Sequence, residues 1–139
     1  RFSRRIIGWN LADHMTEDLV LPVLRQAIHE RQPRPGLIHH TDRGGQYAST
    51  KYRAVLRRAE IAQSMSRADN CYDNAFAESG FGTLKTELEI TRYDHVPTAR
   101  RDIGDYLAYY NLERKHSSLG YLSPHQFELH QTGHTAERK

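Results

Sequence analysis

Hydrophobic residues recur at helical spacing in several stretches of this chain, and short apolar runs typical of strands separate them. The first run, RRIIGWNL, is rich in strand-forming residues and predicts a strand over Arg4–Leu11. Thr16 can cap the helix that follows, because two acidic residues come next and suit the positive end of the helix dipole. The apolar stripe of this helix consists of Leu19, Val20, Val23, Leu24, Ala27 and Ile28. Pro22 lies inside the stripe, so the helix either begins near Leu21 or is kinked at the proline.

Two more strands are predicted on either side of a second helix. The strands correspond to GLIHHT and IAQSMS, at residues 36–41 and 61–66. Ser49 can cap the helix between them, whose stripe consists of Tyr52, Val55, Leu56 and Ala59. Strands that alternate with helices predict one α/β domain with a mixed sheet.

The remainder of the chain is predicted to be helical. One helix runs from about Asp73 to Ile90, and a second runs from about Thr98 to Leu112. The second directs Ile103, Tyr106, Leu107 and Tyr110 inward. Ser123 and Pro124 can begin a last short helix, and we expect a frayed tail from about His130. The predicted domain therefore covers residues 1–129, followed by a disordered tail at 130–139.

The charge of the chain is mildly basic. The 139 residues include 20 Lys and Arg against 17 Asp and Glu, which gives a net charge of +3 and a pI near 9.1. This balance permits a nucleic-acid partner without proving one. The basic residues form three groups, namely Arg1, Arg4 and Arg5, then Arg53, Arg57 and Arg58, then Arg114 to His116. These groups either follow a phosphate backbone or are solvated helix faces.

Cysteine content and hydropathy exclude several classes of protein. Cys71 is the single cysteine, so no intrachain disulfide can form, which fits a reducing compartment. The nine histidines show no HExxH motif and no paired His/Cys spacing, so no structural zinc site is predicted. The chain has no apolar run of about 18 residues and no signal-like segment, which predicts a cytoplasmic protein without a membrane partner. Because the chain starts with Arg1, we expect an upstream segment to be missing.

The segment HHTDRGGQYAST carries the first candidate chemistry. It places Asp42 at the end of a predicted strand, where ligands gather in α/β sheets, and its two glycines allow a sharp turn. Arg43 could pair with a phosphate or an acid. In the helix predicted from residue 73, Asn74, Glu78 and Lys85 share one border of the core stripe. That combination suits a metal and phosphate site, although it also fits a solvated flank with a weak ion pair.

The two acids Asp42 and Glu78 have 35 residues between them. Two-metal phosphoryl chemistry uses several carboxylates because Mg²⁺ prefers oxygen ligands and contacts both the attacking and the leaving oxygen. A third ligand is normally needed to fix two ions. The acid pair alone therefore suggests this chemistry without establishing it.

Four longer motifs resemble one protein family. HHTDRGGQYAS, SMSRADNCYDNAFAES, TLKTE and YYNLERKHSSLGYLSP occur in the order found in bacterial insertion-sequence transposases of the IS-three type, in the product of their second reading frame. The resemblance covers the chain from RFSRRIIGW to about Phe127. It implies a DDE transposase with a retroviral-integrase-like, RNase H-like fold that carries out DNA cleavage and strand transfer.

The resemblance assigns roles to individual residues. Asp42 matches the second acid of the DDE triad, and Glu78 matches the third. Lys85 matches a lysine expected to hold the transposon-end DNA, and Asn74 falls in the DNA-binding signature before the glutamate. Gln46 and Tyr47 match positions that flank the active-site turn; Arg114, His116, Ser117 and Ser118 match a C-terminal motif that is either structural or DNA-contacting.

The same resemblance implies cofactors and partners. Two Mg²⁺ ions, or Mn²⁺, are expected to be held by Asp42, Glu78 and a further acid in the intact enzyme. The expected partners are the transposon ends and the target DNA, further copies of the chain assembled on DNA, and an upstream reading-frame product with a helix-turn-helix. The expected location is the bacterial cytoplasm, with nucleoid association when the protein is bound to DNA.

The chain departs from the family pattern at its start and in the catalytic helix. The first acid of the triad is expected immediately before Arg1, so the chain is expected to be truncated and to lack the first, central strand. Unpaired strand edges would then favour aggregation. Gly80 and Gly82 stand in a helix where the family has bulkier or better helix-forming residues. These departures indicate either a decaying gene copy or a shifted reading-frame start.

Two other functions stay open. The chain could be a non-catalytic DNA-binding or multimerisation remnant of a transposase. It could also be an RNase H-like nuclease that acts on RNA–DNA hybrids, although the HSSLGYLSP motif argues against this alternative.

Overall fold

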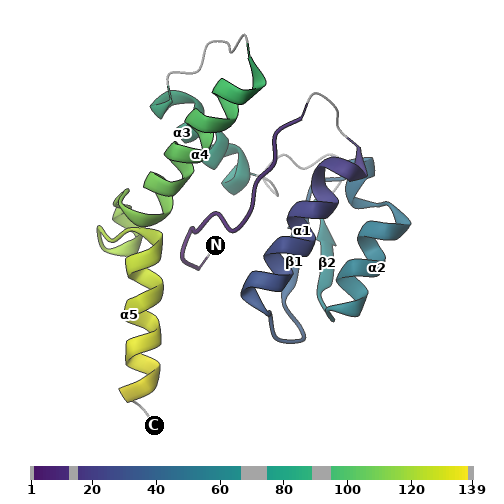
Figure 1. The fold of residues 1–139 in the computed structure, drawn as a ribbon. Helices are drawn as coiled ribbons and strands as arrows, with labels where there is room; N and C mark the ends of the chain where they lie inside the picture. The colour runs from purple at the N-terminus through teal and green to yellow at the C-terminus, as the bar shows by residue number, and fades with distance from the viewer. Residues whose placement is uncertain (1, 13–15, 67–74, 89–94, 138–139) are drawn as a thin grey trace. The chain divides into compact units, whose positions relative to one another are not determined.

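The computed structural model of the 139-residue chain describes residues 2–12, 16–66, 75–88 and 95–137, with only the backbone described for 75–79 and 134–137. Its contacts group the chain into two compact units. The first, here called the sheet unit, comprises Gly8–Glu87; the second, the helical unit, comprises Arg1–Ile7 and Leu88–Lys139. Figure 1 shows the elements of both.

A two-stranded parallel sheet forms the middle of the sheet unit. Strand β1 (Ile38–Thr41) pairs with β2 (Ala62–Met65), with Ile38 opposite Ala62 and Thr41 opposite Met65. Helix α2 (Thr50–Arg58) connects the strands, as a parallel pair requires a crossover. Helix α1 (Glu17–Arg31) contacts α2 and the short 3₁₀ helix η1 (Gly45–Tyr47). The core of the unit consists of Leu21, Leu24, Tyr52, Leu56 and Ile61. The two strands predicted at residues 36–41 and 61–66 are therefore confirmed.

Helix α1 settles one of the alternatives left open by the sequence. It begins at Glu17 and continues through Pro22, so a start near Leu21 is wrong. Thr16 occupies the N-cap position but makes no side-chain cap hydrogen bond, whereas two acids lie in the first turn. The helix ends at Arg31, after which Gln32 takes a left-handed conformation and donates its N–H to the Ile28 carbonyl.

Helix α2 confirms its predicted cap and stripe. The Ser49 hydroxyl accepts a hydrogen bond from the Tyr52 backbone N–H at 3.2 Å, which satisfies a donor that the first turn leaves without a helical partner. Tyr52 and Leu56 are buried in the core, and Val55 and Ala59 pack against it. The spacing of four apolar residues was thus sufficient to orient this helix.

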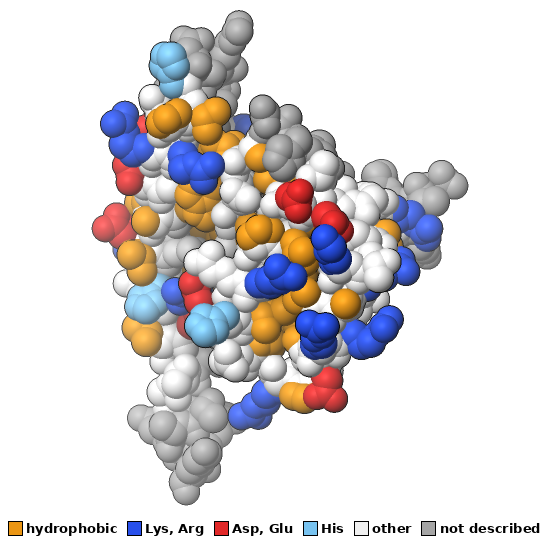
Figure 2. All heavy atoms as spheres, turned by 45° about the vertical axis from the view of Figure 1, so that its right-hand side comes forward, with side chains coloured by type: hydrophobic (Ala, Val, Ile, Leu, Met, Phe, Trp, Pro, Cys, Tyr) orange, Lys and Arg blue, Asp and Glu red, His pale blue; other side chains and the backbone are white. Residues whose placement is uncertain are grey.

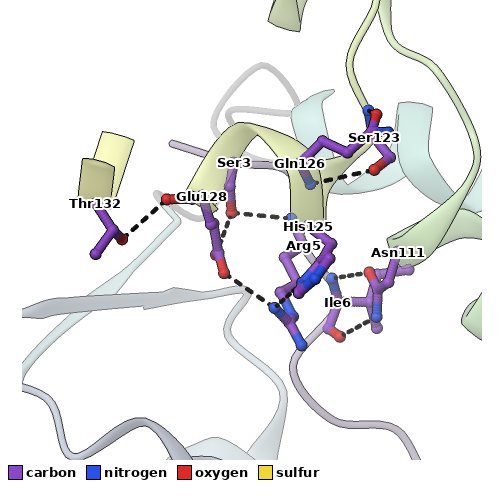
Figure 3. A network of polar contacts seen from close by, with 9 residues as sticks. All are labelled: Ser3, Arg5, Ile6, Asn111, Ser123, His125, Gln126, Glu128 and Thr132. Atoms are coloured by element: carbon purple, nitrogen blue, oxygen red, sulfur yellow. Dashed lines mark hydrogen bonds and ion pairs between the residues drawn. The ribbon is translucent and has the colours of Figure 1, made fainter. Parts of the chain in front are cut away.

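The strand predicted over Arg4–Leu11 is wrong, because these residues form no ladder in the structure. Arg4 has a φ of 58°, which interrupts an extended chain. The backbone of Ile6 is instead paired with one side chain: its N–H donates to Asn111 Oδ1 at 2.9 Å and its carbonyl accepts from Asn111 Nδ2 at 2.8 Å. Figure 3 shows this pair of hydrogen bonds. The Asn111 side-chain amide therefore satisfies the Ile6 N–H and carbonyl, which a neighbouring strand would pair with in a sheet.

The same N-terminal segment is tied to the last helix of the helical unit, as Figure 3 also shows. The Ser3 hydroxyl donates to Glu128 Oε1 at 2.6 Å, and Arg5 Nη1 lies 3.1 Å from Glu128 Oε2. Phe2 packs edge-on against Phe127, with ring centroids 5.1 Å apart. Residues 2–6 thus belong structurally to the C-terminal part of the chain.

Three helical segments make up the remainder of the helical unit. Helix α4 (Val96–Leu112) begins two residues before the predicted Thr98, with a proline in its first turn, and buries Tyr106 and Leu107. The 3₁₀ helix η3 (Ser117–Leu119) leads to α5 (Pro124–Glu137), which contacts α4. The tail predicted from His130 is wrong as far as Glu137, because α5 continues through these residues. Its start is well capped, since Ser123 and Gln126 exchange hydrogen bonds between side chain and backbone.

Helix α3 (Ala75–Glu87) confirms the helix predicted between Asp73 and Ile90, although it ends earlier, at Glu87. Asp73 and Ile90 lie outside the described residues. The helix continues through Gly80 and Gly82, and a Cβ added at either glycine would meet no atom within 4 Å. Neither glycine is thus required by close packing.

Candidate active site

Asp42 lies at the carboxyl end of β1. The residue before it, Thr41, is buried, and its carbonyl accepts hydrogen bonds from the Ser66 N–H at 2.8 Å and the Ser66 hydroxyl at 3.3 Å. Asp42 itself is exposed. A buried, hydrogen-bonded strand end therefore presents a carboxylate to solvent, at the edge of a parallel sheet where ligand sites are usually found.

A glycine turn fixes the orientation of this carboxylate. The Gly44 N–H donates to Asp42 Oδ1 at 2.8 Å. Gly44 has a φ of −57°, so the glycine is not needed for an unusual backbone angle. It is needed for space, because a Cβ there would lie 2.9 Å from Asp42 Oδ1 and 2.8 Å from the side-chain amide of Gln46. The close approach of Asp42, Gly44 and Gln46 is thus built into the turn.

Arg43 joins the ends of the two strands. Its Nε donates to the Ser66 carbonyl at 2.7 Å, immediately after β2. The side chain is exposed, so the rest of the guanidinium keeps its positive charge at the same sheet edge as Asp42. Arg43 therefore links the turn after β1 to the end of β2, and its contact with a phosphate or an acid stays a prediction.

Tyr47 anchors the turn to the core. Its ring meets that of Tyr52 edge-on at 5.5 Å, and its carbonyl accepts from Gln63 Nε2 at 2.7 Å. Half-buried in this way, Tyr47 holds η1 against α2. The DNA contacts predicted for Gln46 and Tyr47 stay predictions, while the packing role of Tyr47 follows directly from these contacts.

Two histidines of β1 support the site and were not singled out from the sequence. His39 Nε2 lies 2.7 Å from the Tyr52 hydroxyl, and burial, together with the neighbouring His40, lowers the pKa of His39. Burial also raises the pKa of Tyr52. His40 lies on the opposite face, with Nδ1 3.0 Å from Ser64 Oγ and Nε2 3.1 Å from Ser66 Oγ. The alternation of side chains along a strand, applied to HHT, could have predicted that the two histidines lie on opposite faces of the sheet.

Helix α3 carries the other predicted acid. Glu78 lies in this helix, seven residues before Lys85, so two helical turns separate them and both fall on about the same face. Lys85 is exposed in the last turn. The side chain of Glu78 and the whole of Asn74 lie outside the described residues, as do Asp69 and Asp73. That the carboxylates of Glu78 and Asp42 lie close together therefore stays a prediction.

The described donor chemistry fits a divalent cation at Asp42. The carboxylate is exposed, one oxygen is oriented by the Gly44 amide, and hard cations prefer such oxygen ligands. Among the side chains that the structure describes, which do not include that of Glu78, no group of three His, Cys, Asp or Glu residues could hold a metal ion. Asp42 thus suits one ligand position, and Glu78 is the candidate for another.

The C-terminal motif has a buried interior. His116 is 5% exposed, and its ring meets that of Tyr110 edge-on at 4.9 Å. Its backbone bridges to Leu122, and Arg114 Nη1 lies 3.1 Å from His116 Nδ1. These contacts give His116 the structural role that the sequence left open; the DNA contacts predicted for Arg114 and His116 stay predictions.

Tyr121 in the same motif combines strain with exposure. Its φ is 62°, directly after Gly120 with φ 66° and ψ 35°. A non-glycine residue in this left-handed region costs about 1–2 kcal/mol. The Tyr121 side chain is 69% exposed, so packing in the structure does not offset this cost. Nothing in the sequence pattern indicated the unusual backbone.

Basic side chains are prominent on part of the surface. On the face shown in Figure 2, Lys and Arg side chains surround an area of hydrophobic ones. In α2, Arg53, Arg57 and Arg58 are exposed beside the buried stripe. None of the helices described is both long and apolar enough to cross a membrane.

Comparisons with known proteins agree with the resemblance drawn from the motifs. Two family profiles, both described as Integrase core domain, match residues 1–71 and 59–124. The transposase for insertion sequence element IS904 of Lactococcus lactis is 44% identical over 91% of this chain and 51% of its own length. Transposase InsF for insertion sequence IS3A of Escherichia coli is 41% identical over 91% of this chain and 45% of its own length. The chain thus spans about half the length of these relatives.

A solved structure shows the fold. The catalytic core domain of BIV integrase matches with a TM-score of 0.59 at 16% identity, over 91% of this chain and 78% of that one. The predicted integrase-like fold class is thereby confirmed.

Proposed function

The chain belongs to the integrase core domain family, and on this premise we propose that it forms the catalytic part of a transposase that cuts and joins DNA at the ends of an insertion sequence. The observation that carries the proposal is the exposed carboxylate of Asp42, oriented by the Gly44 amide at the end of a parallel strand. The relatives named as insertion-sequence transposases support the choice of substrate.

The reaction consists of two phosphoryl transfers. In the first, a water oxygen forms a bond to a phosphorus at the transposon end while the bond from that phosphorus to the 3′-oxygen breaks, and a 3′-hydroxyl is released. In the second, this 3′-oxygen loses its proton and bonds to a target phosphorus, whose own 3′-oxygen leaves and is protonated. Neither step requires a covalent bond to the protein.

Asp42, Glu78 and a further acid of the intact enzyme are proposed to hold two Mg²⁺ or Mn²⁺ ions, in a family that generally depends on divalent metals. When bound, such ions lower the pKa of the attacking hydroxyl and stabilise the leaving oxygen. The Gly44 N–H fixes one oxygen of Asp42, so the remaining lone pairs keep a set direction. The identity and number of the ions rest on the resemblance to DDE transposases.

The polar and basic residues near the acids are proposed to position DNA. Arg43 keeps a positive charge at the sheet edge that carries Asp42, and Gln46 lies in the adjoining turn. Lys85 and Asn74 are assigned to the transposon end. Contacts of this kind go mainly to phosphates, so they fix the register of the DNA and carry no sequence information.

Substitution of the two acids tests the proposal. In the intact protein, Asp42→Asn and Glu78→Gln should each abolish cleavage and joining of labelled end DNA in Mn²⁺ and leave DNA binding within a few fold of wild type. Asp102→Asn, which removes a partly exposed carboxylate of α4 that lies beside Arg101, is the matched control and should stay active. Equal activity in Asp42→Asn and the control would refute the metal-ligand assignment. DNA binding without any cleavage by the wild-type chain would favour the non-catalytic remnant.

Assembly on DNA would involve further chains. We propose that several copies act together on DNA and that the product of an upstream reading frame, with a helix-turn-helix, recognises the ends. Light scattering with and without end DNA tests the first point. A mass that stays that of one chain on DNA would contradict it.

A further inference from the structure

The C-terminal loop from Arg114 to Leu122, here called the Tyr121 loop, has a rigid base. The His116 carbonyl accepts hydrogen bonds from the Leu119 N–H at 3.0 Å and from the Tyr121 N–H at 2.9 Å. The His116 N–H donates to the Leu122 carbonyl at 3.1 Å, which closes the loop. His116 and Leu119 are buried beneath it. The backbone position of Tyr121 is therefore fixed by several independent hydrogen bonds.

The choice of a tyrosine at this position is not explained by the fold. Asparagine and glycine are the residues that tolerate a left-handed backbone, and a bulky aromatic residue there is an outlier. Among the residues that the structure describes, the other non-glycine residues with positive φ are polar: Arg4, Gln32 and Glu60. Tyr121 is both aromatic and 69% exposed, so its ring neither fills a core nor relieves the backbone. Strain that persists in this way points to a function of the side chain.

Other exposed residues of the Tyr121 loop have the chemistry of a nucleic-acid contact. Lys115, Ser117 and Ser118 are exposed, and they supply a cation and two hydroxyl groups. The Arg114 guanidinium lies 5.9 Å from the centroid of the Tyr110 ring, which keeps a second cation at the base of the loop. Cations and hydroxyls contact phosphates, whereas an exposed aromatic ring stacks on a base.

We propose that the Tyr121 loop is a DNA-contacting element in which the Tyr121 ring stacks on an unstacked base and Lys115 contacts the adjacent phosphate. The inference rests on the proposed function, because that function supplies DNA as the substrate. The partner is a base at a DNA end or in a single strand, since only such a base has a face open to a protein ring. The rigid base of the loop holds the ring in place before DNA arrives.

The test uses the full chain and a short single-stranded oligodeoxythymidine that carries one 2-aminopurine, whose fluorescence falls when an aromatic ring stacks on it. Wild type should bind and quench the probe. Tyr121→Phe keeps the ring and should bind within about two-fold, whereas Tyr121→Asn should bind about 5- to 100-fold more weakly and lose the quenching. Because asparagine tolerates the left-handed backbone, Tyr121→Asn should melt at or above the wild-type temperature.

The control is Tyr109→Gln, which removes another exposed aromatic ring, from helix α4, and should bind and quench like wild type. Wild-type binding and quenching together with an unchanged Tyr121→Asn would overturn the inference and leave the proposed function standing. A weaker Tyr121→Asn that also melts at a lower temperature would show a structural role and likewise overturn it. Failure of the wild-type chain to bind the probe and duplex end DNA would overturn both proposals.

Discussion

The turn at Asp42 makes a sharp prediction for Gly44→Ala. The new Cβ would lie 2.9 Å from Asp42 Oδ1, and ordinary contact begins at 3.4 Å, so the carboxylate must move by about 0.5 Å. This movement lengthens the 2.8 Å hydrogen bond from the Gly44 N–H that orients the carboxylate. The backbone angle suits alanine, so the fold should be retained. The effect should therefore fall on the site and not on stability.

The expected size follows from the role of the lost hydrogen bond. Loss of a group that orients a metal ligand typically weakens metal binding by about 10- to 100-fold. A displacement of 1 Å at a reacting centre can cost about 100-fold in rate. For a shift of half that size, we expect Mn²⁺ binding and DNA cleavage both to weaken by about 10-fold.

Electron paramagnetic resonance of free Mn²⁺ during a titration with the full chain measures the affinity directly. Gly45→Ala is the matched control, because a Cβ at Gly45 would meet nothing within 4 Å. It should bind Mn²⁺ like wild type. Equal Mn²⁺ affinities for Gly44→Ala and Gly45→Ala would refute the argument that the Gly44 amide orients the ligand. Failure of the wild-type chain to bind Mn²⁺ would refute the metal site itself.

Two further predictions concern the sheet unit. Leu56 is 2% exposed, so Leu56→Ala should lower the free energy of unfolding measured in urea by about 2–5 kcal/mol. Leu37→Ala, at an exposed position, should change it by less than about 0.5 kcal/mol. Similar losses in both variants would contradict the assigned core. Burial lowers the pKa of His39 below its ordinary value near 6.5, so the unfolded chain binds a proton that the folded chain resists. The stability that the neutral His39 contributes is therefore full above pH 6.5 and falls as the pH drops toward the lowered pKa. The urea midpoint plotted against pH over this range should have a smaller slope in His39→Gln than in wild type. An unchanged slope would exclude His39 as the source of the pH dependence.

The sequence predicted those elements whose signals are local. In α2 the cap at Ser49 and the stripe through Tyr52 and Leu56 agree with one another, so helix, boundary and buried face were all predicted. Strand β1 was predicted because a short apolar run ends in a polar turn. The segment Arg4–Leu11 has equally favourable composition but pairs with a side chain more than 100 residues later, and no local pattern indicates such a partner.

Prediction of the site was limited in the same way. The position of Asp42 at a strand end beside a glycine turn could be predicted from the sequence, whereas the space requirement of Gly44 became clear only from the geometry. His39 was overlooked because its partner, Tyr52, lies on another element. The left-handed backbone of Tyr121 depends on the hydrogen bond that its N–H donates to the His116 carbonyl, and it is likewise invisible in sequence. Features set by neighbouring residues could be predicted, whereas contacts between residues far apart in the sequence could not.

The clasp of residues 2–6 on α4 and α5 has a consequence for the order of folding. The hydrogen bond from Ser3 to Glu128 joins residues 125 positions apart, and that from Ile6 to Asn111 joins residues 105 apart. The sheet unit, in contrast, is continuous from Gly8 to Glu87. Contacts so distant in sequence close slowly, because a long loop must lose its conformational entropy first. On the ribosome the sheet unit can therefore begin to fold while Ser3 and Ile6 still wait for the helices that complete their unit.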